Sequence, residues 1–230
     1  LQRNETKSLV IRGDEKMNVD MNAMKAEVGG AFVVSWLVFG SSGMGLEGAV
    51  ILAAAWMAFA GAHILPVVTW CHMLTGDLGD MDAHMANGMR LLGQMIGSIL
   101  AIALATEFGG IDTPWTADAW AMPEMWPALT AIAAGAIFWQ VHTKADSVWI
   151  SAFAVMALAS AMGMQHDGLT TALDAANPGD WYSTSGANEM GAVIAGFTFG
   201  DLADVLPTFI VDGLLVGIGA RVGTEIDKAI

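Results

Sequence analysis

The residues of this 230-residue chain that could do chemistry are few, and their spacing forms no catalytic or metal site. Cys71 is the only cysteine, which excludes an intrachain disulfide and a cysteine-based metal site. We expect His72 and His142 to be interfacial or packing residues, and the 16 methionines to be apolar filler. No nucleophile–base pair, phosphate loop or metal-ligand spacing stands out. The sequence therefore predicts no enzyme, no cofactor and no metal.

Two acidic residues, Glu27 and Asp212, lie inside apolar stretches. A charge in such surroundings is costly unless another group pairs with it. Glu27 should therefore have a partner. For Asp212 the sequence identifies none.

The amino-acid composition predicts what kind of helices hold these residues. Hydrophobic residues make up 55 % of the chain and charged residues 14 %, with a mean hydropathy of +0.54. Soluble domains carry about 25 % charged residues. The sequence therefore predicts an integral membrane protein, with the lipid bilayer as its first partner. The net charge of −14 argues against a nucleic-acid partner.

Six apolar stretches approach the roughly 20 residues that a membrane-spanning helix needs. They cover residues 27–42, 46–61, 86–106, 126–142, 148–164 and 206–222. Two shorter stretches, 66–74 and 191–199, predict half-helices that enter the bundle without crossing it. We expect residues 1–25 and 223–230 to be tails, and 26–222 to be one channel domain.

Basic residues predict the orientation. With six spans, every lysine and arginine falls on one face, which the positive-inside rule makes the cytoplasm. The nine are Arg3, Lys7, Arg12, Lys16, Lys25, Arg90, Lys144, Arg221 and Lys228. Both termini should then be cytoplasmic, in the cell membrane. The opposite face carries acidic residues only. They form either a solvated acidic surface or an antechamber that concentrates cations.

An internal repeat accompanies the half-helices. Residues 61–68 and 186–193 share the form Gly-Ala-x-x-apolar-(Pro or Gly)-small-Val. Three spans and a half-helix in each half, about 26–106 and 126–222, make an inverted-topology repeat. Such repeats place a binding site or a pore between their halves.

The first repeat resembles a known family. Its segment Gly61-Ala62-His63-Ile64-Leu65-Pro66-Val67-Val68-Thr69 is similar to the aquaporin pore motif Gly-Ala-His-x-Asn-Pro-Ala-Val-Thr. The segments Glu27-Val28-Gly29-Gly30-Ala31-Phe32 and Leu74-Thr75-Gly76-Asp77, with Gln94, also fit that family. The resemblance implies an all-α fold of six transmembrane helices plus two re-entrant half-helices, and a homo-tetramer.

The departures from the family concern its pore. Leu65 and Met190 replace the two motif asparagines, Gly191 replaces the second proline, and Val193 replaces the filter arginine. The resemblance implies a pore lined by His63, Leu65, Pro66, Met190, Gly191 and Val193. An alternative alignment puts Asn177-Pro178-Gly179 at the second motif. The turn-forming residues that follow disfavour it.

The resemblance also implies roles for three further side chains. Glu27 should hold the backbone of the first pore loop. The second half has no matching glutamate in its first helix, so Glu189, next to the second motif, is expected to support the second loop instead. His63 either braces the first loop or contacts the solute. The implied function is a channel for water or a small neutral solute with an unusually apolar pore. A non-conducting membrane scaffold or complex subunit, and a cation-permeable pore, are the alternatives.

Overall fold

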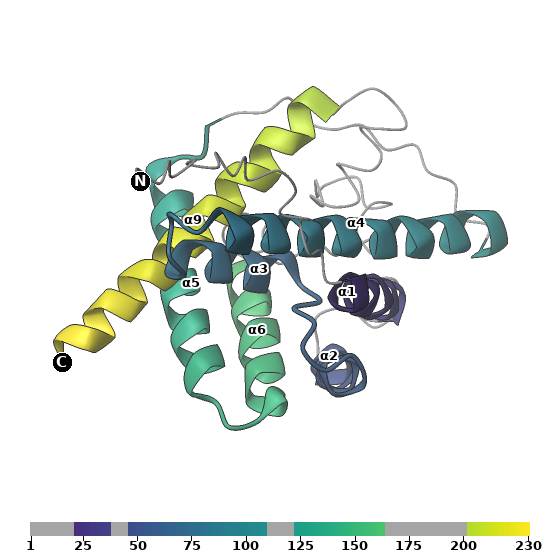
Figure 1. Ribbon diagram of the computed structural model, residues 1–230, viewed down its shortest axis with the longest axis horizontal. Helices are drawn as coiled ribbons and strands as arrows, with labels where there is room; N and C mark the ends of the chain where they lie inside the picture. Colours follow the sequence, from purple (N-terminus) through teal and green to yellow (C-terminus); the bar gives the residue numbers. More distant parts are fainter. Residues whose placement is uncertain (1–20, 38–45, 110–121, 164–201) are drawn as a thin grey trace, which may run out of the picture.

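The computed structural model describes residues 21–37, 46–109, 122–163 and 202–230. These residues form helices and, within those ranges, no strand (Figure 1). The helices are α1 (Met21–Val34), α2 (Leu46–Ala58), α3 (Pro66–Thr75), α4 (Met81–Gly109), α5 (Met125–Lys144), α6 (Val148–Gly163) and α9 (Leu202–Ala229).

The short helix α3 begins and ends where its sequence requires. Pro66 occupies its first turn, where the fixed φ suits a helix and the missing N–H is not needed. Leu65 precedes it in an extended conformation. At the other end the N–H of Gly76 donates to the carbonyl of His72, 3.1 Å away. The helix covers the 66–74 stretch predicted as a half-helix.

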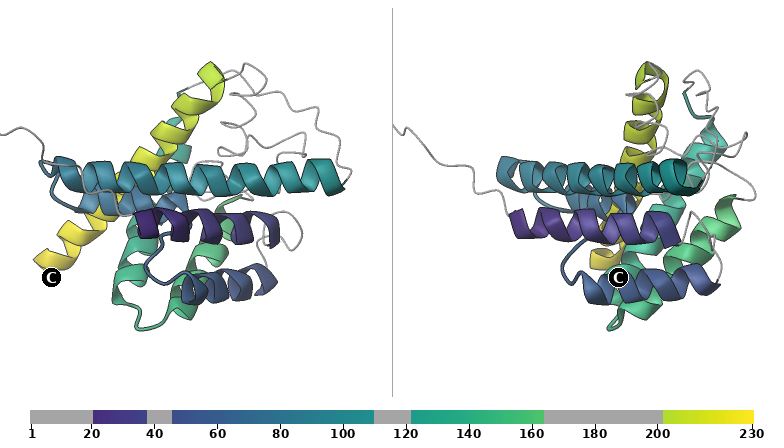
Figure 2. Two further views of the ribbon diagram at one scale, coloured as in Figure 1. Left: turned by 45° about the vertical axis from the view of Figure 1, so that its right-hand side comes forward. Right: turned by 90° about the vertical axis from the view of Figure 1, so that its right-hand side faces the viewer.

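The helices cross at several angles around α3. Helix α1 packs along α4, α5 packs across α9 and beside α6, and α2 packs against α6. Helix α3 lies between α4 and α9. Figure 2 shows α1, α2 and α4 running in a similar direction, while α5 and α9 cross them steeply. The described helices thus share no common axis.

Glycines allow the closest of these crossings. A Cβ added at Gly135 of α5 would overlap the carbonyl of Val216 in α9. A Cβ at Gly219 of α9 would likewise overlap the carbonyl of Ile132. The α5–α9 crossing therefore needs residues without a side chain at both positions.

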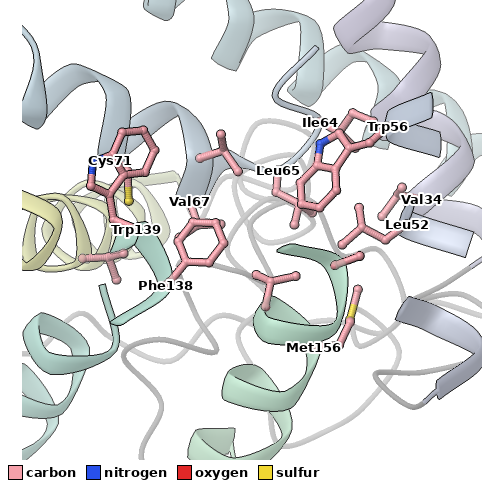
Figure 3. Close-up of a cluster of buried hydrophobic side chains, with 14 of the residues drawn as sticks. Val34, Leu52, Trp56, Ile64, Leu65, Val67, Cys71, Phe138, Trp139 and Met156 are labelled. Carbon is pink, nitrogen blue, oxygen red and sulfur yellow. The ribbon is translucent and has the colours of Figure 1, made fainter. Parts of the chain in front are cut away.

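The apolar core lies between α2, α3, α5 and α6, with further members from α1 and α9. Its large members are drawn in Figure 3: Val34, Leu52, Trp56, Ile64, Leu65, Val67, Cys71, Phe138, Trp139 and Met156. Val67 and Phe138 point toward one another in this view, which joins α3 to α5. Ile64 and Leu65 belong to this core, so they anchor the loop that precedes α3.

The transmembrane prediction is wrong for this structure. Across the described part of the chain, no helix combines the length and the apolar character that crossing a bilayer requires. A crossing takes about 20 apolar residues. Helices α1, α2 and α6 have 14, 13 and 16 residues, so they are too short.

The longer helices α4, α5 and α9 have 29, 20 and 28 residues, and the described part of none of them is apolar over a sufficient length. The six-transmembrane fold class and the integral cell-membrane location are therefore not supported. The placement of both termini in the cytoplasm depended on the same spans and is lost with them.

Several predicted features lie outside the described residues. These are most of the predicted N-terminal tail, the second half-helix at 191–199, and the alternative Asn177-Pro178-Gly179 motif. The predicted end of the last helix at Val222 differs from the structure. Helix α9 continues to Ala229.

Candidate functional site

A tight loop connects α2 to α3 and carries the residues of the predicted pore motif. Gly61 and Ile64 both have positive φ angles, 86° and 65°. The left-handed conformation is uncommon for a β-branched residue such as Ile64, and costs on the order of 1–3 kcal/mol. Contacts around the loop must therefore stabilise it.

The carboxylate of Glu27 supplies those contacts. Its side chain is completely buried in α1. Oε1 accepts a hydrogen bond from the backbone N–H of His63 at 2.6 Å, and Oε2 accepts one from the N–H of Ile64 at 2.7 Å. Two consecutive N–H groups of the strained loop are thus bound by one carboxylate.

Helix α4 completes the coordination of this carboxylate. Arg90 Nη1 donates to Glu27 Oε1 at 2.6 Å, and Gln94 Nε2 donates to Oε2 at 2.9 Å. Each oxygen therefore accepts two hydrogen bonds. Arg90 also neutralises the buried charge, which removes much of the cost of burying Glu27.

Arg90 and Gln94 further connect the carboxylate to its surroundings. The same Arg90 nitrogen donates to the carbonyl of Gly61 at 2.9 Å. Gln94 Nε2 also donates to Thr69 Oγ1 at 2.9 Å, and Thr69 Oγ1 lies 3.0 Å from His63 Nδ1. One network therefore joins α1, the loop, α3 and α4.

Some backbone carbonyls of the loop accept hydrogen bonds, and others do not. The carbonyl of His63 accepts from Trp56 Nε1 at 2.9 Å, and that of Gly61 from Arg90. The carbonyls of Ala62 and Ile64 accept no hydrogen bond from the described residues. They are the acceptors of the loop that the described residues leave unused, and both residues are buried, with 7 % and 0 % of their surface exposed.

Three histidines lie beside this network. The rings of His63 and His72 stack with centroids 4.3 Å apart, and His142 packs on Phe138 and Trp139. Burial, reinforced by His72 and Arg90, lowers the pKa of His63 to about 2. Burial also lowers the pKa of His72 to about 4. These imidazoles are neutral at physiological pH.

Neutral imidazoles could in principle hold a metal ion. The described residues contain no group of three or more His, Cys, Asp or Glu side chains arranged to do so. Burial raises the pKa of the Cys71 thiol, which makes Cys71 a poor ligand and a poor nucleophile.

The structure brings together some of the predicted site residues. His63, Leu65 and Pro66 lie in the loop and the first turn of α3, and Glu27 contacts this loop from α1. Leu65 is only 1 % exposed and belongs to the apolar core. Four other predicted site residues lie outside the described residues: Glu189, Met190, Gly191 and Val193. The proposed pore lining therefore stays a prediction.

Sequence reasoning missed Arg90 as the partner of Glu27. The prediction used Arg90 only to orient the chain, together with the other basic residues. The available signal was the spacing of Arg90 and Gln94, which are four residues apart and share one helix face.

Comparison with known proteins adds no family assignment. No family model matches the chain, and no curated protein is significantly similar to it. The aquaporin resemblance therefore depends on the quoted residues alone.

Proposed function

We propose that the chain forms an aquaporin-like passage for water or a small neutral solute, with the loop at residues 61–65 as part of its wall. One observation carries the proposal. Glu27 binds the consecutive N–H groups of His63 and Ile64 from within the bundle. This is the contact that the resemblance implies for a glutamate at this position.

The contact has a chemical consequence for a passing solute. The N–H groups of His63 and Ile64 are bound to Glu27, and the carbonyls of His63 and Gly61 accept from Trp56 and Arg90, so the loop offers the carbonyls of Ala62 and Ile64. Carbonyl oxygens can replace part of the hydration of a molecule in a narrow passage. They accept from water, hydroxyl or amide groups, so a neutral hydrogen-bond donor is the expected solute.

The apolar side chain at Leu65 should make passage slow. A hydrogen bond that a confined water cannot make costs on the order of 1–3 kcal/mol. An asparagine at this position would donate such a bond, and leucine does not. At about 1.4 kcal/mol per tenfold change in rate, one or two missing bonds would slow passage by roughly ten- to several-hundred-fold.

A second function, a non-conducting scaffold, is favoured by the burial of Leu65. Its side chain packs in the same core as Val67 and Phe138 (Figure 3). If this packing closes the passage, the loop and α3 serve only to hold the helices together.

Osmotic shrinkage of vesicles prepared with the purified chain tests the two functions. Leu65→Asn should raise the rate of solute entry above that of the unchanged chain. Leu52→Asn is the matched control, since Leu52 is also a buried leucine of the core but lies in α2. Rates equal to those of empty vesicles, for both the chain and Leu65→Asn, would reject the passage and favour the scaffold.

A further inference from the structure

Three imidazoles lie close together where the loop, α3 and α5 meet: His63 and His142 are half-buried, and His72 is exposed. The His63 and His72 rings are nearly parallel, with 4° between their planes. The ring of Trp139 packs edge-on against His72 at 4.8 Å and lies 5.7 Å from His142. The proposed passage makes no use of His72 or His142.

We infer that His63, His72 and His142 form an acid-sensitive latch, which holds α3 against α5 while the imidazoles are neutral and releases it when they take up protons. The inference concerns how α3 is held, so it does not depend on the proposed passage. Its physical basis is simple. Two stacked rings 4.3 Å apart cannot both become cations without strong repulsion.

The groups around the latch strengthen this repulsion. From α4, the guanidinium of Arg90 adds positive charge next to His63 and His72. From α1, Glu27 faces His63, but its two oxygens already accept four hydrogen bonds. Neither neighbour provides a free carboxylate for a new cation.

The remaining elements contribute little negative charge to the rings. Helix α3 itself carries the neutral thiol of Cys71, α2 contributes the indole of Trp56, and α6 contains no ionisable residue. From α9, Arg221 donates to carbonyls at the end of α3, and the buried Asp212 precedes Gly213, which lies against Trp70.

The direction of the pH response follows from the pKa values. Burial and the positive neighbours lower the pKa of His63 to about 2 and that of His72 to about 4, from 6.5. Burial lowers the pKa of His142 as well. The unfolded or opened chain therefore binds more protons below about pH 6.5, so acid favours opening.

The response can be measured as a slope. Each imidazole kept neutral by the fold increases the unfolding equilibrium constant about tenfold per pH unit below its ordinary pKa. Urea unfolding of the full chain between about pH 6 and pH 4 should show this steep rise. His72→Phe keeps an aromatic ring in the stack and removes one proton site. Its slope should be shallower, by less than about tenfold per pH unit because His72 is exposed and water screens part of the effect.

His84→Phe is the matched control, since His84 lies at the start of α4 and bonds the carbonyl of Leu78 rather than a ring. It should keep the slope of the unchanged chain. An unaltered slope in His72→Phe would overturn the latch. If that variant does not fold, His142→Phe makes the same test at the other end of the cluster.

Hydrogen exchange distinguishes a latch from general acid unfolding. After correction for intrinsic rates, the amides of residues 67–75 in α3 should lose protection at about pH 5 before those of α9 do. His72→Phe should delay this loss. Simultaneous loss of protection in both helices would show that no local latch exists.

Discussion

Replacement of Glu27 by glutamine tests the network that holds the loop. The substitution keeps the volume of the side chain and removes its charge. Each carboxylate oxygen accepts two hydrogen bonds: His63 N and Arg90 Nη1 on Oε1, Ile64 N and Gln94 Nε2 on Oε2. An amide nitrogen accepts none, so either orientation of the glutamine places it against two donors.

The loss of stability can be estimated in two ways. Each hydrogen bond to a charged group contributes about 1.5–3 kcal/mol, and two are lost. Removing one partner of a buried ion pair costs about 3–5 kcal/mol. The estimates overlap because Arg90 belongs to both, and its 23 % exposure lets water restore part of its solvation. We expect the free energy of unfolding to fall by about 3–5 kcal/mol.

Urea unfolding at neutral pH measures this loss. The control is Glu47→Gln in the first turn of α2, where losing a favourable interaction with the helix dipole costs at most about 1 kcal/mol. A double variant with Arg90→Met should lose less than the sum of the single losses, with a coupling of about 0.5–3 kcal/mol. A loss below about 1 kcal/mol in Glu27→Gln would refute the role of this carboxylate as the support of the loop.

Three further predictions concern the rest of the fold. Gly219→Ala should lower the free energy of unfolding by about 1–3 kcal/mol or more, because α5 leaves no room for a Cβ at this position. Gly88→Ala has open space around it and should raise the free energy of unfolding by roughly 0.5–1 kcal/mol in the same thermal or urea assay. Cys71 should resist alkylation by iodoacetamide in the folded chain and react once urea unfolds it, since its thiol is buried and its pKa is raised; rapid labelling without urea would contradict its place in the core. Lys144→Ala should change the unfolding free energy by under about 1 kcal/mol because the ion pair of Lys144 with Asp227 is exposed; a larger change would give that pair a role that its exposure does not explain.

Local sequence patterns predicted part of the structure well. Pro66 after an extended residue, with a short apolar run behind it, predicted the beginning of α3. The apolar stretches predicted most of the helices, since residues 46–58, 125–144 and 148–163 are helical close to where they were expected. The cost of burying Glu27 predicted that it would have a partner.

Hydropathy failed where the ends of the helices mattered. A sequence window adds apolar residues across a turn as readily as within a helix. The helices α1 and α2 end at Val34 and Ala58, before a full crossing is reached. Composition therefore indicated that the helices have an apolar core, but it did not indicate which apolar side chains the neighbouring helices cover and which, such as Trp36, Met57 and Ile137, stay exposed.

By itself, the sequence determined most of the helical segments and the beginning of α3, because both depend on neighbouring residues in the chain. It also determined that Glu27 must be neutralised, because burying a single charge without a partner is costly. Only the tertiary structure decided that Arg90, 63 positions away, supplies the charge, and that Leu65 lies in the core. It likewise decided that His63 and His72 stack, since their contact needs the loop to turn back over α3. The pairing of Glu27 with Arg90 depends on how α1 packs along α4, and Gly93 and Gly97 of α4 leave room for that close approach.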